Sequence, residues 1–430
     1  MQEARDWTEG ERRILDLGSL PAGAQWTGEF SFSPEGARAA GVMTTDEGEY
    51  SLMTEEGQWT STFDNLWHVA YTPDGRLTAL VSSMGAWTLS VDEESWPGEY
   101  EYIWQPMFSS RDSRIGAAIK LEGQYGMAVD GQDWPRLFPN ATGFTLSPDG
   151  RRSGCVVQTQ PLDEADIQGF QSGIFTVAVD GQPWEKTFIN VWSPCFDAAG
   201  QRAAATVRLA QSTYTIAVDG LPWPKEYSMA WEPCFDPSGG DVLAPVMLNK
   251  RWGLAKNGNM LWDPEYLQLW HVQMDGKGRN IAALGCLRFG RFTVVRNNRP
   301  WHSWYPVLTD LRMSPDGQRA AAVGQVGLEA PEVDPGTKTN KWQVVLDDAP
   351  WSGCYDQVFA PVFSPDSRHL AVRIKHGGKF AFLVDGGLLP RTFDHAWDPV
   401  FTPDSRAVLI RARDEHNLVR IIAPLGRFNS

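Results

Sequence analysis

The stretch FTVAVDGQPW, residues 175–184, decides the fold because the chain writes it more than once. Near copies are YTIAVDGLPW at 214–223 and YGMAVDGQDW at 125–134. In each copy a β-rich run ends at Asp-Gly, the dipeptide that favours a two-residue hairpin turn, and a tryptophan closes the hairpin. Self-similarity at a fixed period is the sequence signature of a repeat architecture. The chain is therefore expected to be built from repeats.

A second motif precedes each copy of the first, whose last two copies are degraded to FAFLVDGGLLP (380–390) and LVRIIAPLG (418–426). It is a turn of the type Ser-Pro-Asp-Gly between two short β-rich runs, as in LSPDGRRSGCVV (146–157) and MSPDGQRAAAV (313–323). The spacing of its copies is 37–41 residues, with two intervals of 50. The ten copies begin at residues 32, 71, 108, 146, 196, 235, 272, 313, 363 and 401.

The runs within one repeat predict strands that are buried on both faces. AAATV (203–207) and YTIAV (214–218) consist almost entirely of apolar or small residues instead of alternating with polar ones. No segment shows sustained helical periodicity. Four short antiparallel strands in about 40 residues, packed between similar neighbours, describe a propeller blade. We predict an all-β β-propeller of about ten four-stranded repeats of roughly 40 residues.

The repeats run on without a linker or a shift in composition. We therefore expect one propeller over residues 1–430, with residues 1–30 as the closing strand and lead-in segment and 31–430 as the repeats. Both one ring of ten blades and two five-bladed rings fit the repeat number, and continuity favours one array. The last repeat ends after its third strand, and RRILDL (12–17) precedes the first repeat. The N-terminal strand is expected to close the ring and so to remove exposed edges.

Composition and charge exclude some classes of function. The 430 residues carry a net charge of −15, so the basic field that binds nucleic acid is missing. Residues 1–100 hold 18 acidic and 5 basic side chains, which either steer a basic protein partner or only keep the chain soluble. The sequence has no run of about 18 apolar residues, so no membrane-spanning helix is predicted. The N-terminus lacks a signal-peptide pattern. We expect a cytoplasmic protein without direct membrane insertion.

Twenty tryptophans fall mainly in two registers of the repeat. The first register closes the Asp-Gly hairpin. An indole there buries on the order of 200 Å², which stabilises the fold by several kcal/mol at about 25 cal/mol per Å² before entropy is subtracted. Because every junction between blades needs the same filler, we expect these residues to be structural: Trp59, Trp96, Trp134, Trp184, Trp223, Trp262, Trp301 and Trp351.

The second register lies eight residues further on. Strand parity places it on the opposite face from the Asp-Gly hairpins, together with two long insertions around 159–172 and at 327–340. Loops on one face of a rigid scaffold often carry binding residues. Packing between blades is the alternative role for these tryptophans. The candidate partner-binding residues are Trp67, Trp104, Trp192, Trp231, Trp270 and Trp397.

No motif for catalysis or cofactor binding is present. The chain lacks a G-x-S-x-G elbow, a P-loop and a G-x-G-x-x-G loop. Its seven histidines lack metal-ligand spacing, and one Asp per turn is too few oxygens for calcium. We expect no catalytic, metal or cofactor site and no enzyme activity. The five cysteines contain no C-x-x-C pair and are expected to be buried structural thiols: Cys155, Cys195, Cys234, Cys286 and Cys354.

The Ser-Pro-Asp-Gly-x-Arg-x-Ala strand pair resembles the propeller repeats of the TolB-like superfamily, within the WD40-like class. The Gly-His and Trp-Asp pairs of true WD40 blades are missing. Length, tryptophan content and the absence of a signal resemble the tryptophan-rich subunit of the Tmc-type transmembrane redox complex of anaerobic bacteria.

That resemblance implies a non-catalytic subunit that docks onto protein subunits of a membrane-bound electron-transfer complex from the cytoplasm, at the inner face of the cell membrane. The cofactors would then belong to the partners. Two alternatives remain open. One is a propeller hydrolase or lyase with channel-lining carboxylates, and the other is a carbohydrate-binding or small-ligand-binding propeller.

Overall fold

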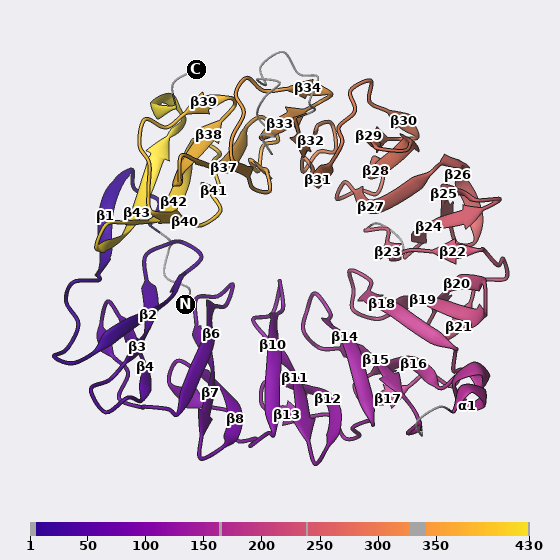
Figure 1. Cartoon of the computed structure of the whole chain (residues 1–430), viewed down its shortest axis with the longest axis horizontal. Coiled ribbons are helices and arrows are strands. Elements are labelled where there is room, and N and C mark those ends of the chain that lie inside the picture. Colours follow the sequence, from indigo (N-terminus) through magenta and orange to yellow (C-terminus); the bar gives the residue numbers. More distant parts are fainter. Residues whose placement is uncertain (1–5, 163–165, 238–239, 327–340, 429–430) are drawn as a thin grey trace. The chain divides into compact units, whose positions relative to one another are not determined.

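Ten antiparallel β-sheets make up the computed structural model, which describes residues 6–162, 166–237, 240–326 and 341–428 (Figure 1). Each sheet has four principal strands, which follow chain order in nine sheets, and in the tenth β1 is the outer strand beside β43. In three sheets the first strand is interrupted. The described residues contain one short α-helix, α1 (Ile167–Ser172), and one 3₁₀ turn, Leu425–Arg427. The predicted all-β propeller of ten four-stranded blades, almost without helix, is confirmed.

The chain forms two compact units. The six-sheet unit comprises Leu20–Pro34 and Ala40–Pro264. Its sheets are, in order, β2 (Gln25–Phe32), β3 (Ala39–Thr44), β4 (Tyr50–Thr54), β5 (Gly57–Gln58); β6 (Asn65–Tyr71), β7 (Leu77–Ser83), β8 (Ala86–Val91), β9 (Glu94–Ser95); β10 (Tyr102–Phe108), β11 (Ile115–Leu121), β12 (Gln124–Val129), β13 (Gln132–Asp133); β14 (Asn140–Leu146), β15 (Ser153–Gln158), β16 (Phe175–Val179), β17 (Gln182–Pro183); β18 (Asn190–Phe196), β19 (Ala203–Ala210), β20 (Thr213–Val218), β21 (Leu221–Pro222); and β22 (Met229–Ala230), β23 (Cys234–Phe235), β24 (Val242–Leu248), β25 (Arg251–Lys256), β26 (Asn259–Tyr266).

The four-sheet unit comprises Met1–Ser19, Glu35–Ala39 and Glu265–Ser430. Its sheets are β27 (Gln268–Met274), β28 (Ile281–Arg288), β29 (Arg291–Arg296), β30 (Arg299–Pro300); β31 (Leu308–Met313), β32 (Ala320–Gln325), β33 (Trp342–Leu346), β34 (Ala349–Pro350); β35 (Gln357–Val358), β36 (Val362–Phe363), β37 (Leu370–His376), β38 (Lys379–Val384), β39 (Gly387–Leu388); and β40 (His395–Ala396), β41 (Val400–Phe401), β42 (Ala407–Asp414), β43 (Asn417–Pro424), β1 (Gly10–Asp16).

One repeat shows how the sequence forms a sheet. The Asp-Ala-Ala-Gly turn joins β18 to β19, which pair with Phe196 opposite Ala203. β19 then pairs with β20, with Ala205 opposite Ala217, and the Asp-Gly hairpin leads to β21. Residues 203–207 of β19 are all buried because neighbouring sheets cover both faces. Both turns therefore lie where the repeat places them.

The hydrophobic core consists of layers between neighbouring sheets. The cluster around Trp134 combines Ala118 and Met127 of the preceding sheet with Phe144 and Val157 of the sheet that follows. Similar clusters recur along both units. A sheet with neighbours on both sides within its unit thus contributes one face to each of two layers, which explains why its central strands lack polar alternation.

The first strand of the chain completes the last sheet. β1 pairs antiparallel with β43, with Glu11 opposite Ile421, as the indigo strand beside the yellow ones in Figure 1 shows. Arg391, between β39 and β40, forms an ion pair with Glu11, with 2.6 Å between Nη1 and Oε2. The N-terminal segment supplies the outer strand that the last repeat lacks. Closure of a ring and the single domain over 1–430 stay predictions.

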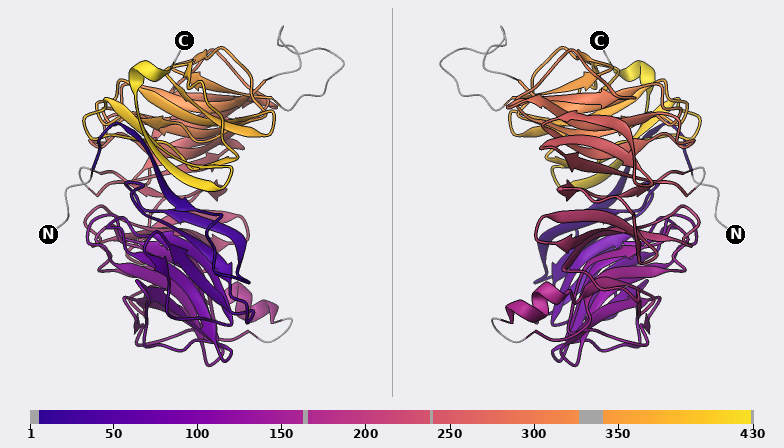
Figure 2. Two further views of the ribbon diagram at one scale, coloured as in Figure 1. Left: turned by 90° about the vertical axis from the view of Figure 1, so that its left-hand side faces the viewer. Right: turned by 90° about the vertical axis from the view of Figure 1, so that its right-hand side faces the viewer.

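Two further features concern the surface. The helix α1 lies in the insertion between β15 and β16 and projects from the sheets in Figure 2, where it is magenta. Asp166 caps it by accepting a hydrogen bond from the Gly169 N–H at 2.8 Å. The second insertion, 327–340, falls outside the described residues. Among the helices that the structure describes, none is long and apolar enough to cross a membrane.

Candidate functional site

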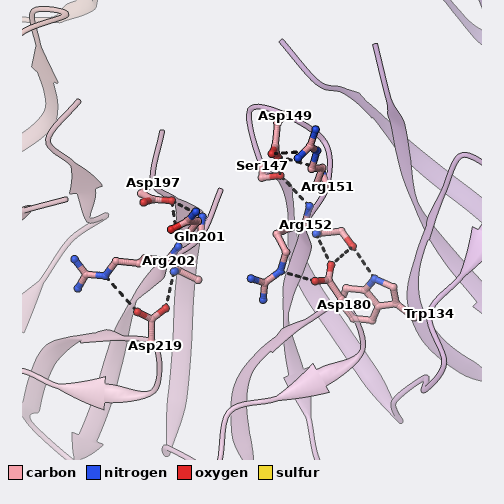
Figure 3. A network of polar contacts seen from close by, with 12 residues as sticks. Trp134, Ser147, Asp149, Arg151, Arg152, Asp180, Asp197, Gln201, Arg202 and Asp219 are labelled. Atoms are coloured by element: carbon pink, nitrogen blue, oxygen red, sulfur yellow. Dashed lines mark hydrogen bonds and ion pairs between the residues drawn. The ribbon is translucent and has the colours of Figure 1, made fainter. Parts of the chain in front are cut away.

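The aspartates of the Asp-Gly hairpins hold the sheets together (Figure 3). Asp180 accepts the Ser153 N–H at Oδ1, 2.8 Å away, and the Arg152 Nε at Oδ2, 2.5 Å away. Its φ of 51° is left-handed, as the hairpin turn requires. The same backbone contact to the start of the second strand recurs in eight sheets, at Asp92, Asp130, Asp180, Asp219, Asn257, Asn297, Asp347 and Asp385. These side chains are turn residues, as the sequence predicts.

The Ser-Pro-Asp-Gly turns are closed by their own side chains. Ser147 Oγ donates to Asp149 Oδ1 at 2.7 Å and accepts the Arg152 N–H at 3.0 Å (Figure 3). The hydrogen bond from Ser147, followed by that from the Arg151 N–H, lowers the pKa of Asp149. The same turn recurs with lowered pKa values at Asp74, Asp316, Asp366 and Asp404. The repeated carboxylates thus serve the fold.

Three tryptophans of the hairpin register contact the hairpin of the next sheet in the chain: Trp96, Trp184 and Trp223. Trp59, Trp134, Trp223 and Trp262 are buried, and the other four are half-buried. The Trp184 ring packs against the hairpin of the next sheet so closely that a Cβ at Gly220 would come within 3.3 Å of it. Glycine at this turn position leaves room for the indole. This geometry agrees with the structural role expected for the register.

The six tryptophans of the second register differ in exposure. Trp67, Trp192 and Trp231 expose 37%, 39% and 43% of their surface. Trp104, Trp270 and Trp397 are half-buried. All six lie on the first strand of their sheets, or in its interruption in the cases of Trp231 and Trp397. The tryptophans of the second register therefore differ in burial, and three of them lie at the surface.

A β-bulge follows the tryptophan in several first strands. The pairing of β6 with β7 shifts between Trp67 and Ala70, and His68 takes a φ of 56°. β18 and β27 show the same shift, with left-handed Ser193 and His271. A bulge bends the strand and changes the direction of the side chains beside it. Sequence analysis missed this feature, although the proline two residues after some of the tryptophans is a signal for it.

Four rings form a group that we call the aromatic cluster: Trp67, Trp87, Tyr102 and Trp104. Trp104 also contacts Tyr125 and the buried Phe144, so the group continues into the core. The ring centroids of Trp67 and Trp87 lie 4.3 Å apart, and Tyr102 stacks on Trp104 at 5.8 Å. Tyr102 contacts both Trp67 and Trp87, so the cluster connects the sheets of β6 and β10, which are neighbours in Figure 1. Tyr102 is 39% exposed. Sequence analysis missed Trp87 and Tyr102, although Tyr-x-Trp at 102–104 places two rings on one strand face.

Acidic side chains flank the aromatic cluster. Asp64 precedes β6, and its Oδ2 accepts the Met84 N–H at 2.6 Å. Glu101 immediately precedes Tyr102 and lies 3.1 Å from Lys120, whose hydrogen bond lowers the pKa of the Glu101 carboxyl. Glu122 is exposed in the turn between β11 and β12. Three carboxylates and one lysine thus lie on the strands and turns next to the rings in the chain, and Glu101 is paired with the lysine.

The other second-register tryptophans do not join this cluster. Each contacts an aromatic ring of its own sheet. The pairs, with their centroid distances, are Trp192 with Tyr214 at 6.0 Å, Trp231 with Trp252 at 5.5 Å, Trp270 with Phe292 at 5.6 Å and Trp397 with His395 at 4.8 Å. The structure therefore brings only Trp67 and Trp104 of the six into one connected group through shared rings.

Metal and thiol chemistry find little support in the described part of the chain. No three His, Cys, Asp or Glu side chains gather there as a metal site would require. None of the five cysteines forms a disulfide, and Cys155 and Cys286 are buried while the others are half-buried. Burial raises the pKa of Cys195 and of Cys234 to about 12, so the reactive thiolate is disfavoured at both.

The fold places the chain in the class of β-propellers. No family model matches the sequence, and no curated protein matches it. Solved structures with similarity include a eukaryotic initiation factor, 14% identical over 78% of this chain and 89% of that one, with a TM-score of 0.48. The Dos1 propeller is 9% identical over 96% and 94% of the two chains, with a TM-score of 0.35. The β-propeller domain of Cps50 (Swd1) from Myceliophteria thermophila is 9% identical over 97% and 99%, with a TM-score of 0.32. The fold assignment rests on the ten sheets themselves.

Proposed function

We propose that this protein is a non-catalytic propeller that docks a protein partner on the aromatic cluster, as a subunit of a membrane-associated redox complex facing the cytoplasm. The exposed aromatic cluster is the observation that carries the docking role. Tryptophan and tyrosine are the residues most enriched among binding hot spots. The rings lie on paired strands and stack on one another, so little side-chain entropy remains to be lost on binding.

The charges near the aromatic cluster indicate what kind of partner surface would fit it. Asp64, Glu101 and Glu122 flank the rings, so a partner with basic side chains around an apolar centre fits best. Such rim charges act mainly on the rate of encounter. The acidic excess of residues 1–100 has the same sign and would add to this steering.

The redox context rests on the resemblance to the tryptophan-rich subunit of the Tmc-type complex. Within the described ranges, no gathering of three metal-ligating side chains exists, so cofactors fit better on the partner subunits. The same proposal makes Trp192, Trp231, Trp270 and Trp397 secondary contacts at most, because each is paired within its own sheet.

The docking test is a pull-down from native membranes with tagged wild-type protein and two variants. Trp67→Ala is expected to reduce recovery of the partner at least tenfold, as loss of a hot-spot ring costs about 2 kcal/mol or more. Trp192→Ala is the matched control, because Trp192 occupies the same repeat position with similar exposure. Equal recovery with Trp67→Ala and wild type, both folded by circular dichroism, would exclude the cluster as the interface.

The redox assignment has its own readout. Mass spectrometry of the wild-type eluate should identify subunits with haem or iron–sulfur ligand motifs. Recovery of a partner without such motifs would contradict the redox role and leave the docking surface supported. Added salt should lower the association rate more than it raises the dissociation rate.

A further inference from the structure

The sheet of β27 to β30 is basic in an acidic protein. Residues 276–309 contain six Lys or Arg and no Asp or Glu, whereas the whole chain has a net charge of −15. Three of the basic or titratable groups gather where this sheet's Asn-Asn hairpin leads to Trp301: Arg296, Arg299 and His302. The repeat has no structural need for such charge, since the other sheets form the same hairpin without it.

Arg296 departs from the pattern that the chain sets for itself. It stands immediately before the hairpin turn, and five other sheets have valine there: Val91, Val129, Val179, Val218 and Val384. Arg296 is half-buried, and its Nη2 donates to the Gly317 carbonyl at 2.7 Å. Its Nε is buried and has no hydrogen-bond partner among the described residues. An unpaired buried donor of this kind costs about 1–3 kcal/mol.

A second arginine stands directly opposite. Arg296 and Arg299 are cross-strand partners in the pairing of β29 with β30. Like charges in this position are destabilising by roughly 0.2–1 kcal/mol. Neither arginine forms an ion pair with a carboxylate of the described chain. Two features that cost stability therefore coincide at one hairpin, as is typical of a site that binds an anion.

The two arginines line an open surface pocket of about 560 Å³ on the four-sheet unit. Trp301, His302 and Asp348 also line it. Asp348 is the one acidic group of the lining, and it already accepts the backbone N–H groups of His302 at 2.8 Å and Ser303 at 2.9 Å. Its Oδ2 also lies 3.0 Å from His302 Nδ1. The charge of Asp348 is thus engaged locally. Arg299 is exposed, and Arg296 is half-buried with its Nη2 bonded to the Gly317 carbonyl.

We infer that this pocket binds a small molecule that carries an oxyanion, a phosphate or a carboxylate, on an apolar ring. Arg296 and Arg299 bind the oxyanion, because the planar guanidinium fork matches phosphate and carboxylate geometry. The Trp301 ring contacts the apolar body of the ligand. The volume lies in the range of small-molecule pockets, roughly 300–1,000 Å³, and exceeds the needs of a free ion. This inference is independent of partner docking, which uses residues of the six-sheet unit.

Calorimetric titration of the full chain with inorganic phosphate, phenyl phosphate and benzoate tests the site. Phenyl phosphate or benzoate is expected to bind at least tenfold more tightly than inorganic phosphate, and the better of the two identifies the oxyanion. Arg299→Gln should weaken binding at least tenfold. This change is compatible with the fold, because Gln132 and Gln182 occupy the equivalent position. Arg288→Gln is the matched control, since it removes the same charge from an exposed position of the same sheet and should leave affinity unchanged.

Thermal unfolding supplies a readout that does not depend on the affinity measurement. Arg296→Val restores the residue of five other sheets, so in anion-free buffer its melting temperature should match or exceed that of the wild type. Saturating phenyl phosphate or benzoate should raise the melting temperature of the wild type and not that of Arg296→Val, because only a ligand of the folded state stabilises it. The inference is wrong if no probe binds the wild type below about 10 mM, the weak limit of calorimetry. It is also wrong if inorganic phosphate binds as tightly as the ring-bearing probes. Equal affinity of the Arg299→Gln and Arg288→Gln variants would contradict it as well.

Discussion

At the scale of single residues, one side chain links the hairpin to the second strand in eight of the ten sheets. Asp219 has a left-handed φ of 49°, and its Oδ1 accepts the Ala203 N–H at 2.8 Å. Asp and Asn tolerate this backbone region better than other residues with a Cβ. Only they also carry an acceptor at the right distance. Asp or Asn therefore recurs at this position because the turn needs a left-handed φ and an acceptor for a backbone N–H of the same sheet.

Replacement of Asp219 tests that explanation. Asp219→Ala should lower the free energy of unfolding by about 2 kcal/mol or more, because it removes an acceptor from a buried N–H and leaves alanine in a strained conformation. Asp219→Asn should cost less than about 1 kcal/mol, because Asn257 and Asn297 make the same contact in other sheets. Urea unfolding midpoints measure both. Equal losses in the two variants would show that the carboxylate charge, and the ion pair with Arg202, dominate instead.

At the scale of elements, neighbouring sheets depend on the indole between them. Trp223 is 8% exposed and packs with Ile216 of its own sheet, with Tyr227 of the segment that leads to the next sheet, and with Val242 of that next sheet. Trp231, in the second register, is 43% exposed and stacks on Trp252 with an interplanar angle of 11°. The two registers thus differ in how many layers they join.

The difference predicts unequal costs of truncation. Trp223→Ala should lower the free energy of unfolding by about 3–5 kcal/mol, as for other buried aromatic residues. Trp231→Ala should cost clearly less, about half or below, because much of the ring is in water already. Thermal unfolding of the two variants in one buffer gives the comparison. Losses of the same size would place the second register in the core.

At the scale of the whole molecule, the two ends of the chain depend on each other. β1 covers the edge of β43, with register from Gly10 opposite Ile422 to Asp16 opposite Asn417. An uncovered edge exposes unpaired N–H and C=O groups and invites pairing between molecules. The last sheet is therefore complete only when the first residues are present.

Deletion of residues 1–18 should destabilise the protein and promote association. We expect a lower melting temperature and concentration-dependent aggregates in light scattering, because β43 becomes an open edge. Glu11→Gln is the control, since it weakens only the exposed ion pair with Arg391 and should cost less than about 1 kcal/mol. A truncated chain that stays monomeric with an unchanged melting temperature would contradict this role for β1.

The repeated turns also give the molecule a pH dependence. Hydrogen bonds from Ser147, Ser314 and Ser364 lower the pKa values of Asp149, Asp316 and Asp366 below their ordinary 3.8. A carboxyl group with a lower pKa in the folded state stabilises the fold above its unfolded pKa, and this contribution is lost as pH falls through the folded pKa. The melting temperature should thus fall steeply below about pH 4.

A triple variant isolates that contribution. With Asp149→Asn, Asp316→Asn and Asp366→Asn, the three groups no longer titrate, so the decrease in melting temperature between about pH 4 and pH 2.5 should become shallower. Differential scanning calorimetry over this range measures the slope. Parallel curves for the wild type and the triple variant would assign acid sensitivity to other groups.

Much of the fold could be predicted from sequence because its determinants are local. Asp-Gly, Asp-Asp and Asn-Asn hairpins depend on backbone preferences within two residues, and uninterrupted runs such as residues 203–207 reflect burial on both faces of one strand. Each of these local patterns is weak alone, and its recurrence in ten repeats made the prediction firm. The bulges after Trp67 and Trp192 were not predicted, because they depend on how the first strand pairs with the second.

The candidate sites depended on tertiary structure. Sequence placed Trp67 and Trp104 in one register with four equivalent tryptophans, and only the arrangement of neighbouring strands shows that Trp87 and Tyr102 join those two into an exposed cluster. Likewise, nothing in the sequence distinguishes Arg296 and Arg299 from the other arginines. Strand pairing places them opposite each other beside a pocket. The sequence by itself determined the repeat, because turns and strands form over a few residues. Only the tertiary structure decided the sites, because exposure, ring contacts and charge pairing depend on residues that come together from separate strands.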